Sequence, residues 1–318
     1  MYSDKKVLLI GGGGTLGTYT AKELLRLGCC VNIVCPEEKV SEHERLCFYQ
    51  EYATMEFLTE LLGKNHYDGI VNFIHYPEIE SYKPFHKLLT EHTEHLIFLS
   101  SYRVYADLEN PITENAPMLL DVTTDQEFLQ KETDALSKAK AEKFLREESD
   151  TKNWTIVRPV ISFSDRRLDI VVRAGREIVR LAAKGEAMVL PEAAKNLTAG
   201  LDWAGNVGKL IANLLFKDEA FEEAYTVSSA QNLTWGEVAD IYTELIGAKF
   251  NWVSTEDYIK YDTRMQKEPW ILIYDRLFDR RIDNSKILTA TGLKKEDFIS
   301  IKEGIKIELD KIKREENE

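Results

Sequence analysis

Short apolar runs alternate with amphipathic segments along the first half of the chain. The apolar runs have the length of buried strands, and they lie at residues 7–10, 31–34, 48–50, 67–74 and 95–101. Apolar residues with helical spacing lie between them, at residues 20–27, 55–62 and 82–90. Strands that alternate with helices in this way predict a doubly wound parallel α/β sheet of the Rossmann type. The ligand site of such a sheet lies outside the carboxyl ends of its strands.

A glycine-rich turn joins the first predicted strand to the first predicted helix. Residues 7–17 read VLLIGGGGTLG, so three glycines have the spacing G-x-x-G-x-x-G. Glycine allows a tight turn and a close approach of phosphate to the backbone, and the helix N-terminus attracts a pyrophosphate. We therefore predict a dinucleotide site here, the alternative being a glycine-rich turn that binds nothing. The predicted contacts are Gly11, Gly14, Thr15, Leu16 and Gly17.

The end of the second predicted strand bears on the choice between NAD and NADP. An acidic residue there holds the ribose 2′-hydroxyl of NAD, whereas a nearby arginine accepts the 2′-phosphate of NADP. Here the position is Cys35, which does neither. Glu37 and Glu38 would repel a 2′-phosphate and favour NAD, Lys39 leaves NADP as the alternative, and a solvated loop explains all three charges equally well. We also place Glu51, which follows the third predicted strand, in the cofactor site.

Composition and charge exclude several classes of protein. The chain has 318 residues, 44% of them hydrophobic and 30% charged, which suits one large or two modest globular domains. A net charge of −13 argues against nucleic acid or an anionic membrane as a partner. No apolar run has the length of a transmembrane helix and no signal-peptide pattern is present, so we expect a cytoplasmic protein.

The four cysteines all lie within the first fifty residues, at Cys29, Cys30, Cys35 and Cys47. They fall on or beside the predicted nucleotide-binding fold, and the spacing of the first two is not that of a zinc site. We expect them to be reduced and to act as small hydrophobic residues, as in cytosolic proteins. The sequence predicts no metal centre.

Motifs along nearly the whole chain resemble one known family, the extended short-chain dehydrogenases/reductases, which includes nucleotide-sugar epimerases and dehydratases. The motifs are LSSYRVY at 99–105, PITENAP at 111–117, KAKAE at 138–142 and WTIVRP at 154–159. Two later stretches, LTWGEV at 233–238 and DNSK at 283–286, look most like an atypical branch. That branch contains the chloroplast stem-loop RNA-binding proteins and bacterial epimerase-like relatives.

The resemblance implies a site in which a serine, a tyrosine and a lysine act together. In the family the tyrosine exchanges a proton as hydride moves to or from the nicotinamide. The lysine holds the nicotinamide ribose and lowers the pKa of the tyrosine, and the serine binds the substrate oxygen. Carried over residue by residue, the serine is Ser101, the lysine is Lys138, and the tyrosine position is Asp134.

Asp134 departs from the family pattern at its most important position, that of the tyrosine that exchanges the proton. A carboxyl group with a pKa near ~3.9 is ionised at pH 7 and is a poor proton donor, and the charge of Lys138 one turn away would lower its pKa further. Three readings stay open: a surface ion pair of Asp134 with Lys138, ribose binding by Lys138 without acid catalysis, and acid/base use of Asp134.

Another residue would have to replace the missing tyrosine. No tyrosine occurs between Tyr105 and Tyr225, so a shifted alignment cannot restore it. Tyr102, directly after the predicted serine, is the best substitute, whereas a packing role suits Tyr105 better. His75 and Tyr76 are weaker candidates.

A basic segment follows the last strand of the resemblance. Residues 170–183 read as a helix with Arg173, Arg176 and Arg180 on one face. The family resemblance implies that arginines here contact a substrate diphosphate, the alternative being a solvated helix face. One of the arginines at 276, 280 and 281 is expected to contact the substrate, and we assign this contact to Arg280.

Two capping signals accompany the later helices. Asp202 precedes a predicted helix over 203–216 and is expected to cap it. Thr234 and Glu237 have the spacing of a capping box, which predicts a helix start and no chemistry. The tail from residue 302 reads as an amphipathic helix.

The two lobes are predicted to interleave along the chain. Residues 1–165, with parts of 186–230 returning to them, form the dinucleotide-binding domain, and residues 166–185 and 231–318 form a smaller substrate-binding lobe. Together these features predict an NAD(P)-binding epimerase-, dehydratase- or reductase-like enzyme with altered acid/base chemistry. Its substrate would be a nucleotide sugar or a similar polar small molecule.

Two other functions are weighed against this enzyme. One is a non-catalytic dinucleotide-binding sensor or scaffold, which the absence of the family tyrosine favours. RNA binding by analogy with the plant relatives is disfavoured by the net charge of −13. The resemblance also implies a homodimer, through helices of the sheet domain.

Overall fold

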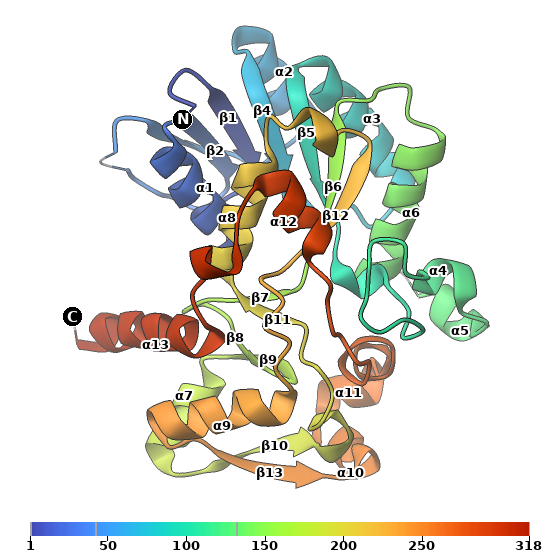
Figure 1. Cartoon of the computed structure of the whole chain (residues 1–318), viewed down its shortest axis with the longest axis vertical. Coiled ribbons are helices and arrows are strands. Elements are labelled where there is room, and N and C mark those ends of the chain that lie inside the picture. The colour runs from blue at the N-terminus through green and yellow to red at the C-terminus, as the bar shows by residue number, and fades with distance from the viewer. Residues whose placement is uncertain (1, 42, 132, 318) are drawn as a thin grey trace.

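The core of the protein is a parallel sheet with helices on both faces (Figure 1). The computed structural model describes residues 2–41, 43–131 and 133–317. In this part of the chain, seven strands form one sheet in the order β12-β6-β5-β4-β1-β2-β3, and all neighbouring strands are parallel. The strands are β1 (Lys6–Ile10), β2 (Cys30–Cys35), β3 (Leu46–Gln50), β4 (Tyr67–Asn72), β5 (Thr93–Leu99), β6 (Trp154–Pro159) and β12 (Glu223–Val227). The predicted doubly wound α/β fold is confirmed.

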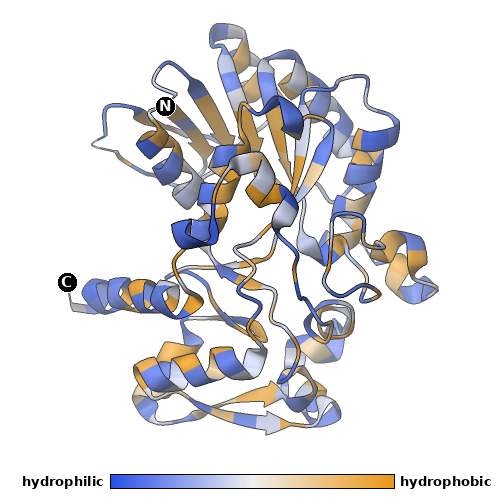
Figure 2. Cartoon of the chain, viewed as in Figure 1, coloured by the Kyte–Doolittle hydropathy of each residue, from blue (hydrophilic) through white to orange (hydrophobic). Residues whose placement is uncertain are grey.

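Alternate side chains of each strand pack under different helices. In β1, Val7 and Leu9 belong to the hydrophobic cluster on one face of the sheet, and Leu8 and Ile10 belong to the cluster on the other. Figure 2 shows the hydrophobic colour concentrated on these central strands. One face is covered by α1 (Thr15–Leu27), α8 (Ala204–Leu214) and α12 (Ser285–Thr291), and the other by α2 (Met55–Lys64), α3 (Ile79–Glu91) and α6 (Asp134–Glu147).

The order of the strands reverses at β1. The chain moves from β1 through β2 to β3 on one side, and then through β4, β5 and β6 on the other. This switch point opens a crevice at the carboxyl ends of the strands, where doubly wound sheets bind ligands. The glycine-rich turn after β1, the segment after β4 and the two serines after β5 all lie at this edge.

The second lobe is built from short strand pairs and helices, and it occupies the lower part of Figure 1. Its parallel pairs are β7 (Ile161–Phe163) with β11 (Leu201–Trp203) and β10 (Ala187–Pro191) with β13 (Lys249–Val253), and its antiparallel pair is β8 (Leu168–Ile170) with β9 (Val172–Gly175). Its helices are α7 (Glu177–Lys184), α9 (Trp235–Ile246), α10 (Thr255–Tyr261), α11 (Thr263–Lys267), a π-helical turn (Leu272–Arg276) and α13 (Ile301–Asn317). Between the lobes lie a 3₁₀ turn (Tyr102–Val104) and the short helices α4 (Leu119–Val122) and α5 (Gln126–Leu129).

The helix predicted over residues 170–183 is wrong in its first half. The chain there forms the hairpin of β8 and β9, with Val171 at φ +54° in the turn, and α7 begins only at Glu177. The run Ile-Val-Val at 170–172 is rich in β-branched residues, and a short apolar run of this kind fits a strand as well as a helix. Arg173 therefore lies on a strand, while Arg176 is the N-cap residue of α7.

Asp202 does not cap α8, because the N-cap residue is Trp203 and no side chain bonds the first turn. The fully buried carboxylate of Asp202 instead accepts hydrogen bonds from the backbone N–H groups of Trp203 and Ser229 and from the side chain of Asn206. It joins β11 to the segment after β12. The capping box of Thr234 and the amphipathic C-terminal helix are both confirmed.

A buried ion pair holds α6 against the sheet. Arg158, in β6, and Glu142, in α6, are each 1% exposed, and the Arg158 Nη2 to Glu142 Oε2 distance is 2.5 Å. Arg158 also donates to the hydroxyl of Tyr105 at 2.7 Å and to the carbonyl of Glu114 at 3.0 Å. No helix in the described part of the chain is long and apolar enough to cross a membrane.

Arg158→Met is expected to lower the free energy of unfolding by about 3–5 kcal/mol, because it leaves the Glu142 carboxylate without its buried counter-charge. The remaining cation near Glu142, Arg146, lies 3.9 Å away and is 46% exposed. Urea unfolding followed by circular dichroism measures this loss. The double variant Arg158→Met/Glu142→Leu removes both charges and is expected to recover much of it. A loss below 1 kcal/mol in the single variant would show that the pair is dispensable.

Candidate active site

The turn between β1 and α1 has the shape that a pyrophosphate needs. Gly11 has φ +72°, and a Cβ on Gly17 would lie 2.3 Å from the Cα of Gly12, so both positions require glycine. A Cβ on Gly14 would meet nothing within 4 Å. Gly14 is also the N-cap residue of α1, and no side chain caps this helix. The residues present therefore fit a dinucleotide whose phosphates approach Gly14 and the first turn of α1.

Charges of both signs surround the glycine-rich turn. The Lys39 ammonium donates to the carbonyl of Gly13 at 2.5 Å, and Arg166 donates to the same carbonyl at 3.4 Å. A carboxylate oxygen of Glu37 lies 2.7 Å from the point where a Cβ of Gly13 would stand. The Ser164 hydroxyl lies 3.0 Å from that of Thr15, so the loop after β7 rests on this turn.

Cys35 and Glu51 lie together beside the turn. The backbone N–H of Glu51 donates to the Cys35 carbonyl at 3.1 Å, and the Glu51 side chain is exposed. Cys35 is 2% exposed, and burial raises the pKa of its thiol. The thiol is therefore a small apolar group at the end of β2.

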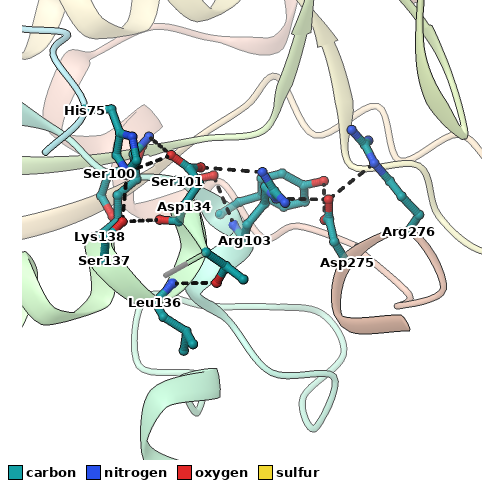
Figure 3. Close-up of polar contacts among 12 residues, drawn as sticks. His75, Ser100, Ser101, Arg103, Asp134, Leu136, Ser137, Lys138, Asp275 and Arg276 are labelled. Atoms are coloured by element: carbon teal, nitrogen blue, oxygen red, sulfur yellow. Dashed lines mark hydrogen bonds and ion pairs between the residues drawn. The ribbon is translucent and has the colours of Figure 1, made fainter. Parts of the chain in front are cut away.

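Ser101, Lys138 and Asp134 line one cavity of about 320 Å³ beside the N-terminus of α1, together with Thr15 and Leu16. Ser101 follows β5 and is the N-cap residue of the 3₁₀ turn, its hydroxyl accepting from the N–H of Arg103 at 3.3 Å. The Lys138 ammonium donates to the carbonyl of Ser100 at 3.2 Å. The structure therefore brings the predicted serine and lysine together at the carboxyl end of the sheet (Figure 3).

Asp134 stands among three basic side chains. Its carboxylate oxygens lie 3.5 Å from Lys138 Nζ, 3.5 Å from Arg103 Nη1 and 3.6 Å from His75 Nε2. Burial alone would raise the pKa of Asp134, but the charges of Lys138 and Arg103, with that of His75, outweigh it and lower the pKa below its ordinary value. Asp134 is therefore an ionised partner for cations at neutral pH.

Lys138 and His75 both have lowered pKa values. Burial is the main cause for Lys138, and the neighbouring carboxylate of Asp134 opposes it. Burial also lowers the pKa of His75, while Asp134 raises it and Lys138 lowers it further. His75 Nε2 lies 2.8 Å from the hydroxyl of Ser137, and the ring is 40% exposed.

The two neighbouring tyrosines point their hydroxyls at other groups. Tyr102 is 2% exposed, its hydroxyl donates to Asp275 at 3.1 Å, and burial raises its pKa. Tyr105 is fully buried, and its hydroxyl lies 2.7 Å from that of Thr226 and accepts from Arg158. Tyr102 lines the Ser101 cavity, but its hydroxyl is bonded to Asp275, and Tyr105 is not among the residues that line the cavity.

The predicted substrate arginines lie in different surroundings. Arg173 lines the Ser101 cavity. Arg176 does not, because its guanidinium pairs with Glu315 at 2.5 Å and with Asp165 at 3.7 Å on the outside of the lobe.

Arg280 is not among the residues that line the Ser101 cavity. It is 1% exposed, donates to the carbonyl of Tyr105 at 2.9 Å and stacks over the ring of Tyr102. Arg276, from the same basic stretch, lines the cavity in its place.

Arg103, Asp275 and Arg276 are site residues that the sequence reasoning did not select. Arg103 Nε lies 3.0 Å from Asp275 Oδ2, and Arg276 Nε lies 3.3 Å from the same oxygen. Figure 3 shows Asp134, Arg103, Asp275 and Arg276 in a row across the two lobes. The basic stretch from residue 276 to 281 was the one sequence signal for Arg276. No local pattern marks Asp275 as a counter-ion for these arginines.

A second cavity, of about 470 Å³, adjoins the first and shares Arg103 and Asp134 with it. Its wall includes Phe128 and Tyr274, whose rings stack at 4.0 Å, and Trp270 beside them. The two cavities therefore meet at Arg103 and Asp134.

One cluster of possible metal ligands lies at the opposite edge of the sheet. His66, Asp68 and Glu94 are close enough to share an ion, at the amino ends of β4 and β5. Lys5 already bonds both carboxylates, at 2.8 and 3.1 Å. This cluster is separate from the Ser101 cavity.

No family model matches the chain, and no curated protein matches it in sequence. Its fold is similar to solved epimerase structures. A UDP-glucose 4-epimerase from Stenotrophomonas maltophila, with bound NAD and formylated UDP-arabinopyranose, has a TM-score of 0.74 at 14% identity, covering 98% of this chain and 99% of that one. A Thermus thermophilus UDP-glucose 4-epimerase complexed with NAD has a TM-score of 0.67 at 17% identity, with coverages of 97% and 99%.

An epimerase from Methanothermobacter thermautotrophicus has a TM-score of 0.70 at 14% identity, with coverages of 95% and 90%. At identities this low, the likeness establishes the shared fold, because one fold can host different activities.

The charges around His75 predict two opposite effects on its pKa. Asp134→Asn removes the carboxylate that raises the pKa of His75, so the pKa should fall further, whereas Lys138→Met removes a repelling charge and should raise it. An NMR titration of the His75 ring measures both, with His43, in the loop before β3, as the internal reference. Identical titration curves in the wild type and both variants would contradict this electrostatic arrangement.

Proposed function

We propose that this protein binds a nicotinamide dinucleotide, NAD in preference to NADP, across the carboxyl edge of its parallel sheet. The observation that carries the proposal is the open side of Gly14 at the uncapped N-terminus of α1. The pyrophosphate would lie against Gly14, Thr15 and Leu16, with Gly11 and Gly17 shaping the turn. The nicotinamide end would then reach the Ser101 cavity, which begins at Thr15 and Leu16.

The preference for NAD rests on the charges around Gly13. The Glu37 carboxylate beside Gly13 would repel a 2′-phosphate, and the Lys39 ammonium is already bonded to the Gly13 carbonyl. Cys35 and Glu51 flank the ribose of the adenosine in this arrangement. The similarity to epimerase structures with bound NAD supports the same choice.

On this proposal the protein is an epimerase-, dehydratase- or reductase-like enzyme that acts on a nucleotide sugar or a similar polar small molecule. Bound NAD supplies the hydride acceptor or donor. Ser101 donates a hydrogen bond to the substrate oxygen, and Lys138 holds the nicotinamide ribose. Asp134 keeps Lys138 and Arg103 in place as an ionised carboxylate, so it does not take over the role of the family tyrosine.

A non-catalytic dinucleotide-binding protein is the second candidate. The lowered pKa of Asp134 favours it, because an ionised carboxylate cannot donate a proton at neutral pH. The hydroxyls of Tyr102 and Tyr105 are bonded elsewhere, which removes the nearest substitutes. Turnover separates the two candidates, whereas dinucleotide binding is common to both.

Calorimetric titration of the wild type with NADH and with NADPH is expected to give tighter binding of NADH. Gly14→Val should weaken NADH binding at least about tenfold, because the side chain fills the open side of the turn, and should leave the melting temperature almost unchanged, because no protein atom lies there. Gly63→Val, in α2, is the matched control, since Gly63 also faces open space but lies away from the turn. Binding of neither dinucleotide would end the proposal.

Ser101→Ala is expected to reduce turnover of a UDP-sugar substrate by about 10²-fold or more while changing the Kd for NADH less than about twofold. The reason is that the hydroxyl acts on the substrate and not on the dinucleotide. Asp134→Asn tests the remaining acid/base reading and should change turnover less than about threefold. Equal losses of turnover and NADH binding in Ser101→Ala would contradict the role of Ser101.

A further inference from the structure

The second cavity, of about 470 Å³, has an aromatic wall that the proposed function does not use. The wall consists of Phe128, Trp270 and Tyr274, and the aliphatic side chains of Ala135 and Ile271 lie beside it. Small-molecule sites commonly have volumes of roughly 300–1,000 Å³ and are mostly apolar, with a few polar groups. The cavity therefore has room for a small organic ligand against the aromatic wall.

The rings of the aromatic wall come from two separate parts of the chain. Phe128, in α5, stacks on Tyr274, in the π-helical turn, with ring centroids 4.0 Å apart and ring planes 15° apart. The Trp270 centroid lies 6.2 Å from that of Tyr274, and the two planes differ by 33°. Aromatic rings favour offset-stacked and edge-to-face neighbours at such separations, so the wall offers a further ring the same kind of contact.

Contacts with the rest of the protein hold the aromatic wall in place. The Tyr274 hydroxyl donates to Asp125 Oδ2 at 2.7 Å, and Asp125 is itself the N-cap residue of α5. Phe128 is 2% exposed and belongs to the same hydrophobic cluster as Leu136. A ligand ring would therefore meet rings that are already oriented, which lowers the entropic cost of binding.

Two rings of the wall retain surface for a ligand to cover. Trp270 and Tyr274 are half-buried, whereas Phe128 is buried. Tyr274 lies in the π-helical turn and Trp270 lies two residues before it. Such turns are rare and are frequently found at functional sites. Covering apolar ring surface that otherwise meets water is favourable, so an apolar ligand gains binding free energy here.

Charge does not select the ligand of this cavity. Four cations and three acids are among the described residues that line it, so the charges nearly balance. Arg103 lies 3.0 Å from Asp275 and 3.5 Å from Asp134. Arg264 lies 3.5 Å from Glu268. The aromatic wall is therefore the feature that distinguishes this cavity.

We infer that the second cavity binds a planar aryl group, stacked against Trp270 and Tyr274. The inference goes beyond the proposed function, because the site needs no dinucleotide and none of the described residues that line it belongs to the glycine-rich turn. The cavity meets the Ser101 cavity at Arg103 and Asp134. A ligand with an aryl group at one end therefore has room for its other end toward Ser101.

The test compares two neutral alcohols of nearly equal size, benzyl alcohol and cyclohexylmethanol, which differ in the aromaticity of the ring. Their Kd values are measured by ligand-observed NMR titration of the full chain. Benzyl alcohol is expected to bind the wild type about threefold or more tightly than cyclohexylmethanol, because only the aryl ring gains the stacking contact. It should also shift the indole N–H signal of Trp270 upfield, because the ring current of a stacked aryl group shields that proton.

Variants then locate the aryl group. Trp270→Leu keeps an apolar side chain but removes a ring of the wall, so the preference for benzyl alcohol should fall below about 1.5-fold. Tyr274→Leu is the second variant and should have the same effect. Trp252→Leu is the matched control and should keep the preference, because Trp252 is also half-buried but lies in β13, outside the cavity lining. Gly14→Val should keep it as well.

Three results would overturn the inference: equal binding of the two alcohols to the wild type, a preference that survives in both Trp270→Leu and Tyr274→Leu, or tighter binding of uridine or D-glucose than of benzyl alcohol at the Trp270 signal. The last would assign the cavity to a nucleobase or a sugar ring. NADH titration of the same preparations keeps this test separate from the proposed function. NADH binding without an aryl preference defeats only the inference, and an aryl preference without NADH binding defeats only the proposed function.

Discussion

The buried pair of Arg158 and Glu142 is the interaction on which the geometry of the site depends. Glu142 is the third member of a stripe along α6, since Asp134, Lys138 and Glu142 are four residues apart and therefore share one helix face. The innermost member is fixed to β6 by Arg158, and it also accepts from the hydroxyl of Ser100. The two outer members are thereby held at the carboxyl end of the sheet. Packing in the core thus sets the positions of side chains that line the Ser101 cavity.

Alternating charges extend this arrangement across the two lobes. Asp134, on the sheet domain, contacts Arg103, which contacts Asp275 in the second lobe, which in turn contacts Arg276. Each link is partly or wholly shielded from water, where ion pairs are sensitive to the loss of a partner. The row therefore couples the site around Ser101 to the orientation of the π-helical turn over 272–276. A ligand that bound Arg276 would change the electrostatic surroundings of Asp134, because Asp275 and Arg103 connect the two residues.

Local signals allowed the sheet, the glycine-rich turn and the capping box at Thr234 to be predicted from the sequence, because each depends on neighbours within a few residues. The helix predicted over 170–183 is wrong in its first half, because an apolar run of β-branched residues fits the period of a strand as well as that of a helix. Arg280 is the arginine predicted to contact the substrate, yet Arg276, four residues earlier, lines the cavity. Which arginine faces inward depends on the course of the chain around Asp275, and no local pattern encodes that contact between lobes.

Asp134 also bears on how readily the site could change. A tyrosine at this position would restore the pattern of the family that the sequence resembles, but it would remove a carboxylate that Lys138 and Arg103 share. Among the described residues, Arg103 would then keep Asp275 as its carboxylate partner, and Arg276 and Arg280 already contact Asp275. A single Asp134→Tyr substitution would leave the surroundings with surplus positive charge, so a compensating change at Arg103 or one of its neighbours would be needed to restore the balance. Asp134 thus ties the identity of one residue to the charges of the residues packed around it.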